Sequence, residues 1–143
     1  MNSFSLGARQ NEQIIVSVTS YERPLSGEFH DDNWLSCEVQ IRVGAFKGRY
    51  GASFLTTEFH DLCKDLERLY RELTGTVVFE SMERQLAFEL TCDHLGHMHA
   101  SGIAMDQAGV GHALHFSLSF DQTELARSIA ELREVVRVFP LRS

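Results

Sequence analysis

Basic residues, cysteine pairs and long apolar runs are scarce in this sequence of 143 residues. Thirteen lysines and arginines stand against 20 aspartates and glutamates, which gives a formal net charge of −7. Because contacts to phosphates require clustered basic side chains, this balance argues against direct binding of nucleic acid and favours a basic partner. No segment approaches the roughly 18 consecutive apolar residues of a membrane span, and the first ten residues lack the apolar core of a signal peptide. We therefore expect a cytoplasmic protein with no membrane partner.

The cysteines and the missing catalytic motifs narrow the function further. Cys37, Cys63 and Cys92 form an odd set without CxxC spacing, and each has apolar or strand-like neighbours, among which a free cysteine behaves as a small hydrophobic residue. The sequence contains neither GxSxG nor HExxH, the local signatures of common hydrolases. We therefore expect reduced thiols and a non-enzymatic protein without a cofactor.

Hydrophobic periodicity predicts strands and two helices in a repeated order. The clearest strand is WLSCEVQIRV at residues 34–43, where apolar and polar side chains alternate at every position after Trp34. A helix should begin near Thr57 and stop at Gly75, and a second should begin at Asp121, where a capping box with Glu124 is expected, and end before Pro140. The other strands are expected at residues 13–21, 50–54, 76–82, 85–92, 97–105 and 112–120.

This order predicts the fold class. Short connections between successive strands favour hairpins, so we expect an α+β fold: antiparallel meanders, with two amphipathic helices packed on one face of the sheet. The chain should form a single domain over residues 1–143, with a flexible segment at residues 1–10. Because two helices cover only one face of a wide sheet, the other face is expected to be solvated or covered by a partner subunit, as in a homodimer.

The stretch CDHLGHMHASG concentrates titratable side chains. It holds three of the seven histidines, His94, His97 and His99. Residues 93–96 suit a hairpin turn, which would place His97 and His99 on the same strand face. Imidazoles in this arrangement could bind zinc, but the spacing matches no closed zinc module. A polar hairpin is favoured, and a metal-binding protein or metal-dependent enzyme using His94, His97 and His99 is the alternative.

A surface for a protein partner is the remaining candidate site. Residues 24–33 form an acidic loop, and the polar face of the following strand is flanked by Trp34. Aromatic and charged side chains together are typical of docking surfaces, because aromatic rings supply contact area and charges supply steering. The candidate partner-binding residues are Glu28, Asp31, Asp32, Trp34, Glu38 and Arg42.

A glycine-rich stretch, GAFKGRYG at residues 44–51, carries Lys47 and Arg49. Converging backbone N–H groups in such a stretch could hold an anion. It joins a strand to a strand and matches no phosphate-binding fingerprint, so a basic hairpin tip is the favoured interpretation.

Several segments together resemble a family of small bacterial proteins, the WapI-type immunity proteins. They are DNWLSCEVQIRVGAFKGRY, the LxxLY motif at residues 66–70, the FExME motif at residues 79–83 and the FxLSFDQTxL run that ends the last strand. The resemblance extends from about Asn33 to Pro140. It implies an α+β binding protein that neutralises a toxin by occlusion, and it supplies no catalytic residues. With the acidic charge, it leads us to expect a basic toxin domain as the partner.

Overall fold

The computed structural model describes residues 2–143, which form two four-stranded antiparallel sheets and three helices. The α+β class and the order of a meander followed by a helix are confirmed. The first sheet contains β1 (Asn2–Ala8), β2 (Glu12–Tyr21), β3 (Trp34–Val43) and β4 (Phe46–Leu55), in that spatial order. The second contains β5 (Thr76–Glu80), β6 (Leu86–Cys92), β7 (Met98–Met105) and β8 (Ala113–Phe120). The helices are α1 (Phe29–Asp32), α2 (Thr56–Glu72) and α3 (Gln122–Val138).

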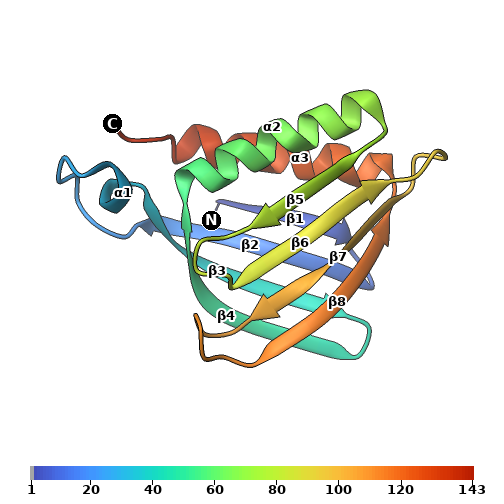
Figure 1. Cartoon of the computed structure of the whole chain (residues 1–143), viewed down its shortest axis with the longest axis horizontal. Coiled ribbons are helices and arrows are strands. Elements are labelled where there is room, and N and C mark those ends of the chain that lie inside the picture. The colour runs from blue at the N-terminus through green and yellow to red at the C-terminus, as the bar shows by residue number, and fades with distance from the viewer. Residues whose placement is uncertain (1) are drawn as a thin grey trace.

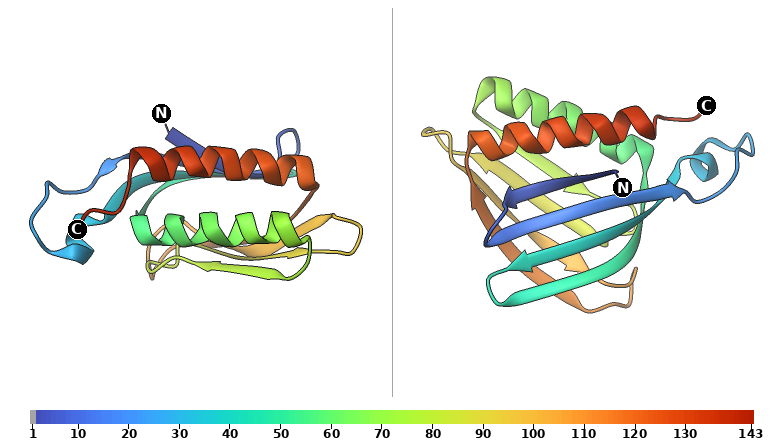
Figure 2. Two further views of the ribbon diagram at one scale, coloured as in Figure 1. Left: turned by 90° about the horizontal axis from the view of Figure 1, so that it is seen from above. Right: turned by 180° about the vertical axis from the view of Figure 1, so that it is seen from behind.

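The two sheets face each other, and their strands cross at a large angle (Figure 1). Helices α2 and α3 lie side by side at one end of this arrangement (Figure 2), with α3 against β1 and α2 against β5. The sequence left open whether the strands form one sheet or two, and it predicted a sheet face left for solvent or a partner subunit. Instead, the apolar faces of the two sheets cover each other within the chain, so the outward faces can be polar without a partner.

Alternation along the strands builds the core between the sheets. In β3 the side chains of Leu35, Val39 and Ile41 are at most 2% exposed, as the pattern predicts. A row of aromatic rings then joins the layers. The ring of Phe54 lies 5.2 Å from that of Phe59 on α2 and 6.1 Å from that of Phe79 on β5. Because these rings come from three elements, burying them fixes both sheets against α2.

Both long helices begin and end close to the predicted positions. At the start of α3, Oδ1 of Asp121 accepts hydrogen bonds from the backbone N–H groups of Thr123 (3.0 Å) and Glu124 (3.3 Å), and Oε1 of Glu124 accepts one from Asp121 N–H (2.9 Å). The predicted capping box is confirmed. Helix α2 begins one residue before Thr57 and ends as Leu73 adopts a left-handed conformation with φ of 53°. Within residues 2–143, no helix is long and apolar enough to cross a membrane.

Two elements were not predicted. Residues 1–10 were expected to be flexible, but Asn2–Ala8 forms β1, paired with β2 over seven residues, with Phe4 and Leu6 buried; Met1 lies outside the described residues. Its serines and glycine weaken the strand pattern, and α3 supplies the missing stabilisation. Oε1 of Glu131 on α3 accepts hydrogen bonds from the backbone N–H (2.9 Å) and Oγ (2.8 Å) of Ser5. The short helix α1 lies within the predicted acidic loop.

Candidate functional site

The loop between β2 and β3, residues 22–33, projects beyond the sheets at one end of the molecule (Figures 1 and 2). Asp32 organises it from the inside. Its Oδ1 accepts hydrogen bonds from the backbone N–H (2.8 Å) and Oγ (2.6 Å) of Ser26, and its Oδ2 accepts one from Gly27 N–H (2.8 Å). The hydroxyl of Ser26 is the main cause that lowers the pKa of this carboxyl group. Asp32 is 0% exposed, so this residue, which we predicted to contact a partner, instead holds the loop in shape.

Asn33 ties the loop to two distant parts of the chain. Its Nδ2 donates hydrogen bonds to the carbonyl oxygens of Phe29 (2.7 Å) and Arg142 (2.8 Å). Its Oδ1 accepts hydrogen bonds from Oγ1 of Thr56 (2.6 Å) and from Arg142 N–H (2.9 Å). The side chain is 0% exposed and all its hydrogen-bonding capacity is used. The loop is therefore held against the start of α2 and the C-terminal segment.

Arg142 completes this attachment. Its Nε donates to the carbonyl oxygen of Asp32 (2.8 Å), and its Nη2 donates to that of Arg23 (2.9 Å). The guanidinium lies 3.7 Å from the centre of the Tyr21 ring, in a cation–π arrangement. The Tyr21 hydroxyl donates to the carbonyl oxygen of Pro140. Because both ends of the loop are fixed by these contacts, it is ordered before any partner binds.

The ordered loop presents apolar and acidic side chains together. Leu25 is 62% exposed and Phe29 44% exposed, and Leu141, at 41%, follows in the C-terminal segment that Asn33 holds beside the loop. Glu28 is exposed, and the half-exposed Asp31 lies 3.2 Å from Arg23, which offsets part of its charge. We call these five residues, Leu25, Glu28, Phe29, Asp31 and Leu141, the loop surface. Its carboxylates were predicted from the sequence and its apolar members were not, although Leu25 and Phe29 in an otherwise polar loop were a usable signal.

The other predicted partner residues lie elsewhere on the first sheet. Trp34, Glu38 and Arg42 share the outward face of β3, as the alternation predicts. Arg42 is eight residues from Trp34, which corresponds to roughly 26 Å along a strand. Glu38 lies 3.6 Å from Arg49, and Nη2 of Arg42 donates to the carbonyl oxygen of Gln10 (3.1 Å). The structure therefore groups Glu28 and Asp31, and it separates both from Arg42.

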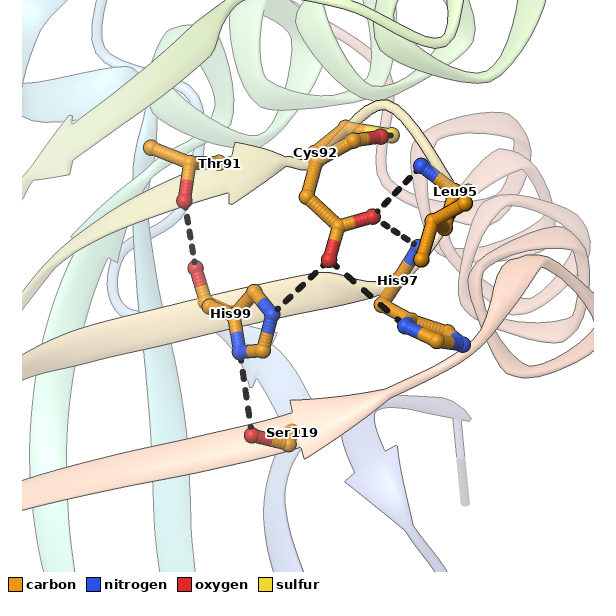
Figure 3. Close-up of polar contacts among 7 residues, drawn as sticks. Thr91, Cys92, Leu95, His97, His99 and Ser119 are labelled. Carbon is orange, nitrogen blue, oxygen red and sulfur yellow. Dashed lines mark hydrogen bonds and ion pairs between the residues drawn. The ribbon is translucent and has the colours of Figure 1, made fainter.

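The histidine-rich stretch is a hairpin (Figure 3), and Asp93 organises its turn. Oδ1 of Asp93 accepts hydrogen bonds from the backbone N–H groups of Leu95 (2.8 Å) and His97 (3.0 Å). Its Oδ2 lies 3.5 Å from Nδ1 of His97 and 3.4 Å from Nε2 of His99. The hydrogen bond from His97 N–H is the main cause that lowers the pKa of Asp93 to about 2. This carboxylate therefore serves to close the turn.

The geometry does not favour the metal alternative. His97 and His99 share a face, as predicted, and Nδ1 of His99 lies 3.2 Å from Oγ of Ser119 on the neighbouring strand (Figure 3). His94 is exposed in the turn. Over residues 2–143, no group of three or more His, Cys, Asp and Glu side chains is placed to hold a metal ion. The hairpin is a polar structural element in this arrangement.

The thiols are poorly suited to nucleophilic chemistry. Cys37 is 5% exposed, and burial raises its pKa to about 12. Burial also raises the pKa of Cys63 and of Cys92. Because the thiolate is the reactive form, these shifts keep all three side chains protonated near neutral pH.

The fold and the loop surface define an α+β protein whose best-organised candidate site is an exposed surface that is ordered in advance. Comparison with known families places the chain more narrowly. The model of the Immunity protein WapI-like family matches residues 5–140, and the chain belongs to this family. The resemblance found between Asn33 and Pro140 is thereby confirmed and extended to the N-terminal strand. A search of curated proteins found no match.

Proposed function

We propose that this protein is an immunity protein that neutralises a cognate toxin by binding it, without catalysing a reaction. Membership of the WapI-like immunity family supports a toxin as the partner. The observation that carries the proposal is the loop surface, where exposed leucine and phenylalanine side chains stand beside carboxylates on a loop fixed by Asp32, Asn33 and Arg142. Occlusion of the toxin by this surface is the mechanism we propose.

The loop surface has the properties that tight binding requires. Because the loop is already ordered, little conformational entropy is lost when it binds. Apolar side chains at the centre of an interface supply most of the binding energy, and charges at the rim mainly raise the association rate. With a net charge of −7, the protein attracts a basic domain over a distance of about 10 Å at 0.1 M salt.

A pair of charge reversals tests the role of the carboxylates. We expect Glu28→Lys with Asp31→Lys to lower the association rate for the toxin domain encoded beside this chain by at least about tenfold at low salt. The control is Asp61→Lys with Glu72→Lys, which makes the same change of charge at exposed positions of α2. Surface plasmon resonance at two salt concentrations measures both rates. Equal rates for the two double variants would remove the loop surface from the mechanism.

The apolar centre is tested separately. Phe29→Ala should raise the dissociation rate and leave the association rate within about twofold, because truncating an apolar anchor weakens the complex after it has formed. Asp32 is unsuitable for such a test, since its buried carboxylate maintains the loop. An unchanged dissociation rate for Phe29→Ala would show that the toxin binds elsewhere.

A homodimer stays a prediction, but the uncovered apolar sheet face on which we based it is absent from the described residues. We expected an uncovered sheet face to be solvated or to bind a partner subunit, whereas the two sheets cover each other's apolar faces. Light scattering on the free protein measures the mass, and the charge reversals above should leave that mass unaltered if the loop surface is reserved for the toxin.

A further inference from the structure

The edge of β4 is a second surface that is organised for binding. The outer strands β1 and β5 lie against α3 and α2, whereas β4 and β8 end their sheets on the side away from these helices (Figure 1). The carbonyl oxygen of Gly51 accepts a hydrogen bond from Nε2 of Gln85 (3.0 Å), so it points away from β3. Hydrogen-bonding directions alternate along an edge strand, so the backbone groups of Lys47 and Arg49 also point outward. Among the described residues, neither has a backbone partner on that side.

The two sides of this edge differ in chemistry. Between β4 and the start of β8 there is a pocket of about 220 Å³, lined in part by the apolar side chains of Ile41, Phe46 and Leu114. Phe46 is 65% exposed. On the outward face of the first sheet, a hollow of about 550 Å³ is lined in part by Arg42, Lys47 and Arg49. The free edge therefore runs between an apolar pocket and a basic hollow.

We propose that the free edge of β4, from Phe46 to Tyr50, binds an extended acidic segment of a partner protein as an additional strand. Side chains of a strand point alternately to its two sides, so such a segment would direct apolar side chains into the pocket and carboxylates toward Lys47 and Arg49. At Gly51 the outward carbonyl oxygen already accepts a hydrogen bond from Gln85, so the free part of the edge ends before this residue.

The basic side chains beside the β4 edge favour an acidic segment of another protein over a second copy of this chain. If β4 paired with β4 of a second copy, the Lys47 and Arg49 side chains of both copies would gather on one sheet face, and like charges in neighbouring positions destabilise strand pairing. Arg49 keeps one acidic neighbour, Glu38, at 3.6 Å, so Lys47 and Arg42 are the less compensated charges. An acidic segment of a different chain fits this edge. The proposal does not depend on the toxin, because the loop surface carries the opposite charge.

Binding of defined peptides tests the proposal. The probe is a fluorescein-labelled heptapeptide that alternates glutamate and valine, followed by fluorescence anisotropy at low salt. We expect it to bind at least tenfold more tightly than the same peptide with lysine in place of glutamate. Two further versions are N-methylated at the glutamates or at the valines. One of them should lose binding, because one of these two sets of N–H groups must face β4.

Variants of the edge give the decisive comparison. Lys47→Glu with Arg49→Glu should reverse the preference, so that the lysine peptide binds more tightly than the glutamate peptide. Lys64→Glu with Arg71→Glu, at exposed positions of α2, makes the same change of charge and should preserve the original preference. Arg49→Pro removes an outward N–H that makes no bond to β3 and should weaken binding at least tenfold.

Specific results would overturn this inference. They are the absence of glutamate-peptide binding up to millimolar concentration, equal binding of both N-methylated versions, or an unaltered preference in the Lys47→Glu, Arg49→Glu variant with a wild-type thermal midpoint. The Glu28→Lys, Asp31→Lys variant should bind the glutamate peptide as the wild type does. A failure of toxin binding is thereby distinguished from a failure of the β4 edge.

Discussion

Replacement of Asn33 by alanine should loosen the whole loop surface, because this one side chain connects the loop, α2 and the C-terminal segment. The substitution removes four hydrogen bonds, to Phe29, Thr56 and twice to Arg142. Each is worth about 1 kcal/mol net, which gives a loss of about 4 kcal/mol. Thr56 is only 2% exposed, so its hydroxyl would lose its partner without gaining water. The loss is large against a typical stability of about 5 to 15 kcal/mol.

Thermal unfolding measures the effect of this substitution on global stability, and hydrogen exchange measures its effect on the loop. For a chain of this size, about 4 kcal/mol corresponds to a fall in Tm of roughly 12 °C. Amide exchange should also accelerate at Ser26 and Gly27, whose N–H groups are held by the neighbouring Asp32. Ser36→Ala, at an exposed position of β3, is the matched control and should leave both readings unaltered. A fall in Tm below about 3 °C with unaltered exchange would refute the claim that Asn33 orders the loop.

Two further predictions concern the hairpin and the thiols. The pKa of Asp93 is lowered from 3.8 to about 2, so its carboxylate stabilises the fold above pH 4 and loses this contribution as pH falls toward 2. The Tm of Asp93→Asn should therefore lie below that of the wild type at pH 5 and converge with it near pH 2; a constant gap would contradict this. Cys92 is only partly buried, so a thiol reagent at pH 8 should modify it before Cys37, and Cys92→Ala should abolish the fast phase. A fast reaction at Cys37 would mean that the sheets open readily.

The predicted and observed positions of β3 and α3 agree closely because both elements are specified by local sequence. The polar–apolar alternation from Leu35 to Val43 involves only neighbouring residues, and so does the capping pair of Asp121 and Glu124. Both patterns can therefore be recognised without knowledge of the rest of the chain. The same holds for the turn at Asp93, where the hydrogen bonds span at most four residues. These elements were predicted with their inward and outward faces, and the order of elements then indicated the α+β class.

The candidate site was predicted only in part, because exposure depends on contacts far along the chain. Glu28 is exposed and Asp31 is half-exposed, but Asp32 turns inward to bond Ser26 and Gly27. The sequence of this acidic loop does not indicate which carboxylate turns inward. The apolar members of the loop surface were missed. Leu141, for example, is brought to the loop by long-range contacts such as that between Arg142 and Asn33, which are 109 residues apart.

By itself the sequence determined the elements, their amphipathic faces, the acidic charge and the family resemblance, because each follows from local spacing or from composition. Tertiary structure alone decided that eight strands divide into two facing sheets, that residues 2–8 form an edge strand, and that the β4 edge stays free. Each of these depends on pairing between segments that are remote in the chain. Ser5 and Glu131, for example, are 126 residues apart, yet their hydrogen bonds hold β1 against α3.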